Sequence, residues 1–221
     1  VETSCRVERI LTDGKRVRAV VANGREIGCR AVVSNGSLPR TVMEWTGKEN
    51  FTPEFISSLK QVRLSSSSCQ VYIGIKPGEK LPYIGDLLFS SEYPEYDAEA
   101  LKASQVTSRT YSVYYPGIRP ESNQSSIVAS MNAEFDDWKD KTPEEYRKAK
   151  QAMIDDSLDA LEKYVPNIRK IADFTEAATP LTFQHYTGHQ NGATFGTKFE
   201  GLSKSMKLHE ELPGLFHTGS V

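Results

Sequence analysis

Two histidines have a spacing that could support metal chemistry. His185 and His189 form an H-x-x-x-H pair, which on one face of a helix would place two imidazoles against a zinc ion. The segment around them, TPLTFQHYTGHQNG, is rich in Thr, Gly and aromatic residues, and this composition favours strand and loop. We therefore expect the two rings to be separated and to act as hydrogen-bonding groups, and we predict no bound metal.

The other reactive side chains do not form a catalytic set. Cys5, Cys29 and Cys69 are widely spaced among strand-like residues, which indicates buried, reduced thiols in a cytosolic setting. No serine occupies a G-x-S-x-G nucleophile elbow, and His209 lies in a charged stretch typical of solvated surface. Adjacent carboxylates, as at 136–137, diverge on a helix rather than share a site. The sequence therefore assigns no catalytic residue.

The glycine spacing argues against a self-contained dinucleotide site. A phosphate cradle needs closely spaced glycines, so that backbone amides at the start of a helix can approach the anion. None of the 15 glycines stands two residues from another, and both G-x-G-x-x-G and the P-loop are absent. We expect that this chain alone does not bind a dinucleotide tightly.

The composition predicts an ordinary soluble globular protein. The 221 residues are 38% hydrophobic and 25% charged, with a mean hydropathy of -0.48, which excludes both disorder and a membrane-embedded class. A formal net charge of -2 gives no field that would attract nucleic acid, which we exclude as a partner. The length favours one large domain, or one and a fraction.

The elements that must position these groups begin with a β-meander. Over the first thirty-odd residues, Asp13-Gly14 and Asn23-Gly24 separate strand-like runs and supply tight hairpin turns. Further along, the runs SCQVYIGIK, RTYSVYY and SSIVASMNA alternate in side-chain character, which predicts strands of one sheet.

Helix signals lie between and after these strands. RTVMEW suggests a short helix, and PEFISSLKQV a second one with Thr52 as its cap. The longest helix is predicted from Pro143 to Val165, with Thr142 and Glu145 in a capping box. Hairpins without regular βαβ alternation favour an α+β fold with a mixed, mostly antiparallel sheet and helices packed on it. Both ends of the chain fall within strand patterns, so we expect an internal piece of a longer protein.

Three segments, in this order, resemble one family. RVERILTDGKRVRAVVANGREIGCRAVVSNGSLP is similar to a meander that ends in a V-V-S-N strand before a proline. ATPLTFQHYTGHQNGATFG resembles a T-P...Y-x-G...G-A-x-x-G stretch, and LPGLFHTGSV a P-G-L-Y-x-x-G strand. These are features of the FAD-dependent phytoene desaturase, carotenoid isomerase and retinol saturase group. The resemblance covers the two ends and about a third of the chain.

The resemblance implies a set of flavin contacts. Val7 stands where a strand backbone of the family faces the adenine, and Ser34 with Asn35 ends the strand that passes near the dinucleotide. Gly219 and Ser220 stand where the family backbone approaches the ribityl and pyrophosphate region. FAD is therefore the expected cofactor of the full-length parent. We do not expect this fragment to retain it, and we predict that the purified fragment is colourless and inactive.

The second motif implies the substrate contacts. Its small residues would let a planar ring or a polyene approach, and its aromatic faces would pack a flat apolar substrate. Five residues are expected to line an apolar groove next to the isoalloxazine: Phe183, Tyr186, Gly192, Ala193 and Phe195. Core packing is the alternative for the aromatic residues.

The resemblance also implies a domain organisation and a function. Residues 1–36 would be a meander of the FAD-binding domain, 37–212 the substrate-binding domain, and 213–221 a strand returning to the FAD-binding domain. The parent would desaturate, isomerise or saturate a carotenoid or another long apolar substrate in the cytoplasm, with a peripheral membrane contact left open. Its missing FAD-binding segments would be the partner of this chain. Another flavin amine oxidase-type oxidoreductase and a non-catalytic lipid-binding module are the alternatives.

Overall fold

The computed structural model describes residues 1–14, 16–101, 103, 105–118 and 123–219. They form two compact units, which we call the discontinuous unit (Val1–Ser65 with Gln184–Val221) and the central unit (Ser66–Phe183). Helices and antiparallel strands occur in both, which confirms the predicted α+β class. Among the described residues, the one parallel pairing of strands lies in the discontinuous unit.

The meander forms as its turns predict. Strands β1 (Val7–Thr12), β2 (Val17–Ala22) and β3 (Arg25–Gly28) make an antiparallel three-stranded sheet. Asn23 and Gly24 have φ values of 47° and 71°, the two positive angles of a tight hairpin turn. Asn23 Oδ1 also accepts a hydrogen bond from Arg6 N at 3.0 Å. The turn therefore fixes the register of the hairpin from within the local sequence.

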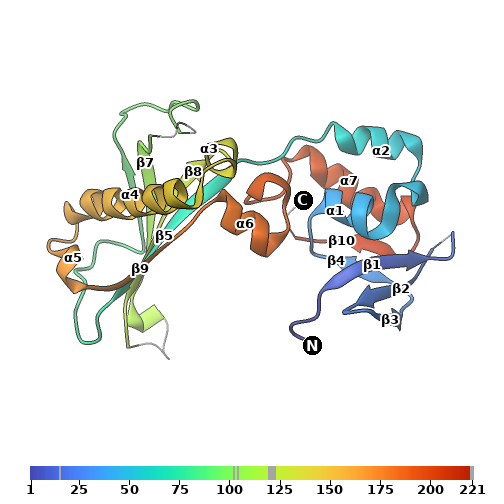
Figure 1. Ribbon diagram of the computed structural model, residues 1–221, viewed down its shortest axis with the longest axis horizontal. Coiled ribbons are helices and arrows are strands. Elements are labelled where there is room, and N and C mark those ends of the chain that lie inside the picture. Colours follow the sequence, from blue (N-terminus) through green and yellow to red (C-terminus); the bar gives the residue numbers. More distant parts are fainter. Residues whose placement is uncertain (15, 102, 104, 119–122, 220–221) are drawn as a thin grey trace. The chain divides into compact units, whose positions relative to one another are not determined.

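Two short strands from opposite ends of the sequence pair in the same unit. Strands β4 (Val32–Ser34) and β10 (Leu215–His217) run parallel, with Val33 opposite Phe216 (Figure 1). Val17 N donates to Pro213 O at 3.0 Å, so the meander also contacts the approach to β10. Among the described residues, the meander region and the final strand therefore lie side by side.

The helices of the discontinuous unit enclose its core. Helix α1 (Leu38–Arg40) continues into a π-helical segment, η1 (Thr41–Gly47), and a 3-10 turn, η2 (Lys48–Asn50). Helix α2 (Pro53–Lys60) begins as predicted, because Thr52 Oγ1 accepts from Phe55 N at 3.3 Å. With helix α7 (Glu200–Glu211) they bury Ile10, Val17, Leu38, Val42, Phe51, Phe55, Leu59, Leu208, Leu212 and Leu215.

The central unit is built on a five-stranded antiparallel sheet. Its strand order is β6 (Leu87–Ser91), β7 (Ser108–Tyr114), β8 (Ser126–Ala133), β5 (Ser67–Ile75) and β9 (Ala172–Ala178). The three strands predicted from alternation, β5, β7 and β8, are neighbours in this sheet. The two outer strands, β6 and β9, were not predicted. A 3-10 turn, η3 (Pro116–Ile118), follows β7.

One face of this sheet is covered and the other is open. Helix α4 (Pro143–Glu162) crosses the covered face, with short helices α3 (Asp136–Lys139) before it and α5 (Ile168–Ile171) after it (Figure 1). The predicted capping box is present, since Thr142 Oγ1 accepts from Glu145 N and the Glu145 carboxylate accepts from Thr142 N. The side chains buried between α4 and the sheet include Val71, Ile73, Tyr111, Ile127 and Ala129 of the strands and Met153, Leu158 and Leu161 of the helix.

The segment around the histidine pair departs from the prediction. Strand and loop were expected, but Pro180–Thr187 is helix α6, followed by a 3-10 turn, η4 (Gln190–Gly192). The helix begins at Pro180 and is followed by Gly188, which has a φ of 71°. Proline at the start and glycine just past the end are helix signals, and here they outweigh the strand preference of the aromatic residues.

The prediction that the three cysteine thiols are buried is confirmed for only one of them. Cys69 is 2% exposed on the covered face of the central sheet. Cys5 and Cys29 are free thiols of intermediate exposure, so the prediction of burial is wrong for both. The reason is their place at the edges of the meander: Cys5 precedes β1, and Cys29 follows β3, whose four residues are all exposed.

The compact units divide the chain differently from the predicted domains. The sequence boundaries were placed after residues 36 and 212, whereas the units divide after Ser65 and after Phe183. Residues 37–65 and 184–212 pack with the terminal strands because α2 and α7 share the core of β10. The assignment of these segments to flavin or substrate binding stays a prediction.

Candidate functional site

The parallel pair creates an edge at which a ligand could bind. Both β4 and β10 end at the same side, at Ser34 and His217, and Thr218 N donates to Ser34 O at 2.9 Å just beyond. In sheets of parallel strands, ligands bind outside the carboxyl ends of the strands. Asn35, Thr218 and Gly219 are exposed at this edge. We call Ser34–Gly36 together with His217–Gly219 the carboxyl edge.

Ser34 holds the carboxyl edge in place from inside. Its side chain is buried, and its hydroxyl lies 2.7 Å from Thr41 Oγ1 of η1. The same hydroxyl accepts a hydrogen bond from Gly36 N at 3.3 Å. Its hydroxyl and carbonyl are therefore engaged within the protein, and Ser34 shapes the turn that presents Asn35.

Two glycines allow close packing at the carboxyl edge. Gly219 has a φ of 85°, and a Cβ at this position would overlap Asn35 Oδ1. A Cβ on Gly36 would lie 2.6 Å from the ring of Trp45. Asn35 therefore lies directly over the backbone of Gly219, and its amide and the exposed backbone form one polar surface.

His217 joins three segments at the carboxyl edge. Its Nε2 lies 2.8 Å from Gly36 O, and its Nδ1 lies 2.9 Å from Ser205 Oγ of α7. Because a carbonyl can only accept, Nε2 carries the proton and Nδ1 of the neutral ring accepts from the serine. Burial lowers the pKa of His217, the bond to Gly36 opposes this, and the nearby His189 lowers it further. The neutral imidazole therefore links Gly36 to Ser205 of α7, and we call this pair of hydrogen bonds the His217 clamp.

Sequence reasoning did not single out His217. The residue lies within the third motif, LPGLFHTGSV, but no neighbouring acid or base marked it. Its partners Ser205 and Gly36 are distant in sequence and come together through the β4–β10 pairing. The one available signal was its place as the last residue of an apolar strand.

The structure brings three of the five predicted flavin residues together. Ser34, Asn35 and Gly219 lie at the carboxyl edge. Val7 begins β1 and pairs with Ala22 in the three-stranded sheet, which is a different sheet. Ser220 lies outside the described residues. A role of these residues in flavin binding stays a prediction.

The predicted substrate residues differ in exposure. Phe183 and Tyr186 lie three residues apart on α6, and Tyr186 is 82% exposed. Phe195 is 70% exposed, and its backbone N donates to Ser65 Oγ at 3.1 Å. Gly192 and Ala193, by contrast, are buried. The two exposed aromatic residues are therefore not part of a sealed core, and their contact with a substrate stays a prediction.

The histidine pair is separated by the end of a helix. His185 lies in α6 and its ring meets that of Tyr186 edge-on, with centroids 4.9 Å apart. His189 follows the helix, and its Nδ1 donates to Ala193 O at 2.9 Å. In the part of the chain that the structure describes, no three His, Cys, Asp or Glu side chains are grouped as metal ligands. His209 is exposed, as predicted, and also stacks on Phe216 with centroids 5.5 Å apart.

The open face of the central sheet is a second candidate surface. Many of its side chains are short, and three of them, Gly74, Ser126 and Ser130, come from neighbouring strands. Between larger side chains the face has a hollow of about 430 Å³. The hollow is lined in part by Tyr72, Tyr114, Val128 and Phe174. It is large enough for a small molecule, for which sites of about 300–1,000 Å³ are usual.

Comparison with curated proteins gives distant relatives. No family model matches the chain. A chloroplastic prolycopene isomerase of Daucus carota is 22% identical over 198 residues, which are 89% of this chain and 32% of that protein. An all-trans-retinol 13,14-reductase of Danio rerio is 26% identical over 116 residues, 48% of this chain and 19% of that protein. The chain spans about a third of the length of the isomerases it matches.

The fold is supported by a solved structure with a TM-score above 0.5. An oxidoreductase from Methanosarcina mazei superposes with a TM-score of 0.55 and 14% identity, over 98% of this chain and 43% of that one. Cyclohexylamine oxidase from Brevibacterium oxydans gives a TM-score of 0.44 at 16% identity, over 78% of this chain and 33% of that one. Across the described residues, no helix has both the length and the apolar character needed to cross a bilayer.

Proposed function

We propose that this chain contacts FAD through its carboxyl edge and a long apolar polyene through another surface. The chain is a distant homologue of prolycopene isomerases and retinol saturase, in the phytoene desaturase-like family of FAD-dependent oxidoreductases. The proposed reaction of the parent protein is desaturation, isomerisation or saturation of a carotenoid or related isoprenoid. The observation that carries the proposal is the pairing of β4 with β10, which brings Asn35 and Gly219 to one exposed edge.

The carboxyl edge fits one side of a dinucleotide. Because Gly219 has no Cβ, the Asn35 amide packs directly on its backbone, and these exposed polar groups can offer hydrogen bonds to a ligand. Asn35 and Gly219 would therefore contact FAD, while Ser34 and His217 position them. FAD, when bound, supplies the redox chemistry, and the protein supplies orientation and exclusion of water. Because FAD would supply the redox chemistry, the sequence motifs need not contain an acid, a base or a nucleophile.

The bare face of the parallel pair supports a larger flavin domain. Val33 is 66% exposed and Phe216 42% exposed, on the same face of the two strands. Parallel strands are ordinarily buried on both faces. We therefore propose that further FAD-binding segments of the parent cover Val33 and Phe216 and extend this sheet.

We place the polyene over the open face of the central sheet. The hollow there has aromatic and aliphatic walls at Tyr72, Tyr114 and Phe174, and apolar burial is what holds a hydrocarbon, at about 25 cal/mol per Å². A Cβ on Gly74 would lie 3.5 Å from Phe174 Cβ, an ordinary contact, so a larger side chain there fills the hollow without strain. Gly74→Val should lower polyene turnover by the parent and leave its flavin content unchanged.

The proposal is tested on the full-length parent. The purified parent should show flavin absorbance and should convert prolycopene or all-trans-retinol, the compounds in the names of its relatives. Gly219→Ala should reduce the flavin bound per chain, because its φ of 85° is strained for alanine and the methyl overlaps Asn35. Gly117→Ala is the matched control, since a Cβ there meets nothing within 4 Å. Equal flavin content in the two variants would contradict the assignment of the carboxyl edge.

Two alternative functions predict different results. Another flavin amine oxidase-type oxidoreductase would bind FAD through the same edge but oxidise amines and leave both polyenes unchanged. A non-catalytic lipid-binding module would retain a polyene but no flavin. Measuring flavin content, polyene conversion and amine oxidation on one preparation therefore separates all three functions.

We further propose that the apolar side of α7 contacts a membrane surface. Phe199, Leu202 and Met206 are 91%, 46% and 66% exposed, and their spacing puts them on the side of the helix opposite buried Leu208. The helix carries Lys204 and Lys207 but also three glutamates, so its exposed apolar side chains rather than its charge would hold it at a membrane. Exposed apolar residues on one side of a helix are typical of helices that lie in a membrane interface.

Vesicles test this contact. The chain should sediment with phosphatidylcholine vesicles, and Phe199→Ser should release it. Equal sedimentation of the wild-type and Phe199→Ser chains would refute the contact.

A further inference from the structure

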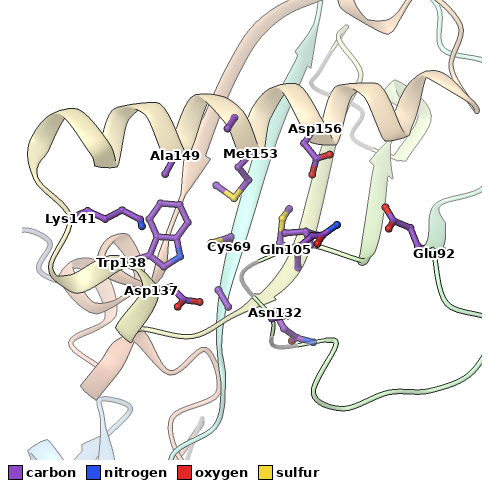
Figure 2. A pocket seen from close by; sticks show the side chains of 15 residues that line it. Cys69, Glu92, Gln105, Asn132, Asp137, Trp138, Lys141, Ala149, Met153 and Asp156 are labelled. Carbon is purple, nitrogen blue, oxygen red and sulfur yellow. The ribbon is translucent and has the colours of Figure 1, made fainter.

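The central unit contains a cavity that the proposed flavin and polyene surfaces do not use. It has a volume of about 440 Å³ and lies on the covered side of the sheet, between strands β5 and β8 and helices α3 and α4 (Figure 2). The open face proposed for the polyene is the opposite face of the same sheet. The volume falls within the range of about 300–1,000 Å³ that is usual for small-molecule sites.

The walls of the cavity are largely apolar. The side chains that form them are small or sulfur-containing apart from one indole: Cys69, Ala103, Val106, Met131, Ala133, Trp138, Ala149, Ala152 and Met153. Burial, with a contribution from Asp137, raises the pKa of the Cys69 thiol to about 12. The cavity therefore offers a neutral thiol and no thiolate for a metal or an electrophile.

Three carboxylates contribute to the lining. Figure 2 shows those of Glu92, Asp137 and Asp156 on three different segments, with Glu92 and Asp137 at opposite ends of the cavity. Among the described residues, Lys141 is the one basic side chain of the lining. Lys141 Nζ lies 5.7 Å from the centroid of the Trp138 ring and is held at that side.

The three carboxylates differ in their ion pairing. Asp156 already pairs with the buried Arg109. Among the described residues, neither Glu92 nor Asp137 has an ion-pair partner. An apolar chamber with such a carboxylate in its wall suits a ligand that has an apolar body and a positive head.

We propose that this cavity binds an organic cation with an apolar body, such as an alkylammonium or arylammonium ion. The body would occupy the space between Met153, Met131 and Trp138, and the positive group would lie beside the Asp137 carboxylate. The site is independent of the flavin assignment, since all of its residues belong to the central unit.

Trp138 fluorescence reports on the site. A Trp45→Phe chain keeps Trp138 as its one tryptophan, because the sequence has two. Titration with hexyltrimethylammonium should change the emission saturably, whereas hexanesulfonate, with the same alkyl length and opposite charge, should bind at least about tenfold more weakly. Calorimetry on the unmodified chain checks that the Trp45 replacement has not altered the site.

Three variants test the assignment of the residues. Asp137→Asn should weaken hexyltrimethylammonium binding about tenfold, an effect of about 1.4 kcal/mol. Ala149→Leu, a substitution that suits a helix, should abolish binding by filling the cavity without lowering the melting temperature. Asp136→Asn is the matched control, because the neighbouring Asp136 pairs with Lys139 and does not line the cavity. Absence of saturable binding, equal binding of the two probes, or equal effects of the Asp136 and Asp137 variants would overturn the proposal.

Discussion

Replacing His217 tests the clamp at the carboxyl edge. His217→Phe keeps an aromatic ring of similar size but removes the hydrogen bonds to Gly36 O and Ser205 Oγ. Leaving partly buried polar groups without partners costs about 1–3 kcal/mol. We therefore expect the free energy of unfolding of the discontinuous unit to fall by about 2 kcal/mol at neutral pH.

The same residue should make stability depend on pH. Burial lowers the pKa of His217 in the folded chain below the ordinary value of 6.5, so the unfolded chain binds the proton more readily. The contribution of the neutral ring is complete above pH 6.5 and is lost as the pH falls toward the lower folded pKa. With one proton involved, the slope is at most about 1.4 kcal/mol per pH unit. His217→Phe should remove this slope.

Urea denaturation between about pH 5 and pH 8 measures both the free energy of unfolding and its dependence on pH. A Trp138→Phe background leaves Trp45 as the one tryptophan, and Trp45 lies against Gly36 within the clamped region. His185→Phe is the control, because it removes an exposed histidine on α6. An equal pH slope in the His217→Phe and His185→Phe chains, or a wild-type stability that rises as the pH falls, would refute the reasoning.

Three further outcomes are expected. Thr142→Ala should lower the free energy of unfolding of the central unit by about 1 kcal/mol in urea melts, because it removes the N-cap of α4, and an unchanged midpoint would contradict the role of the capping box. The resemblance implies a second place for the polyene, beside Phe195, and there Phe195→Asp should lower polyene turnover by the parent at least about tenfold while flavin absorbance stays, since a charge desolvated beside hydrocarbon is costly; normal turnover would leave the open face of the central sheet as the polyene site. The purified chain should be colourless, and stoichiometric flavin absorbance would overturn that expectation.

Local signals in the sequence predicted most of the elements. Asn23-Gly24 requires a tight turn, and Thr142 with Pro143 requires a helix start, so these features follow from a few adjacent residues. Strands β5, β7 and β8 followed from alternation because each has one buried face. Strands β6 and β9 lie at the two edges of the sheet, where alternation is weaker, and they were missed.

The site could be predicted only where sequence motifs marked it. The motif resemblance singled out Ser34, Asn35 and Gly219, and the β4–β10 pairing brings these three residues together. His217 was missed because its partners come from two other segments, which no local pattern connects. The cavity under α4 was also missed, since Cys69 and Asp137 meet there through tertiary packing.

The discontinuous unit has a consequence for the order of folding during synthesis. Its core needs Leu208, Leu212 and Leu215, which leave the ribosome after the whole central unit. Until then, core residues such as Leu38 and Phe55 cannot pack against these leucines. The two parts of the discontinuous unit must also be brought together across the whole central unit. The central unit, whose residues are contiguous, can form first. A nascent chain stalled before α7 should therefore expose an apolar surface that invites chaperones or proteases, even when its five-stranded sheet is complete.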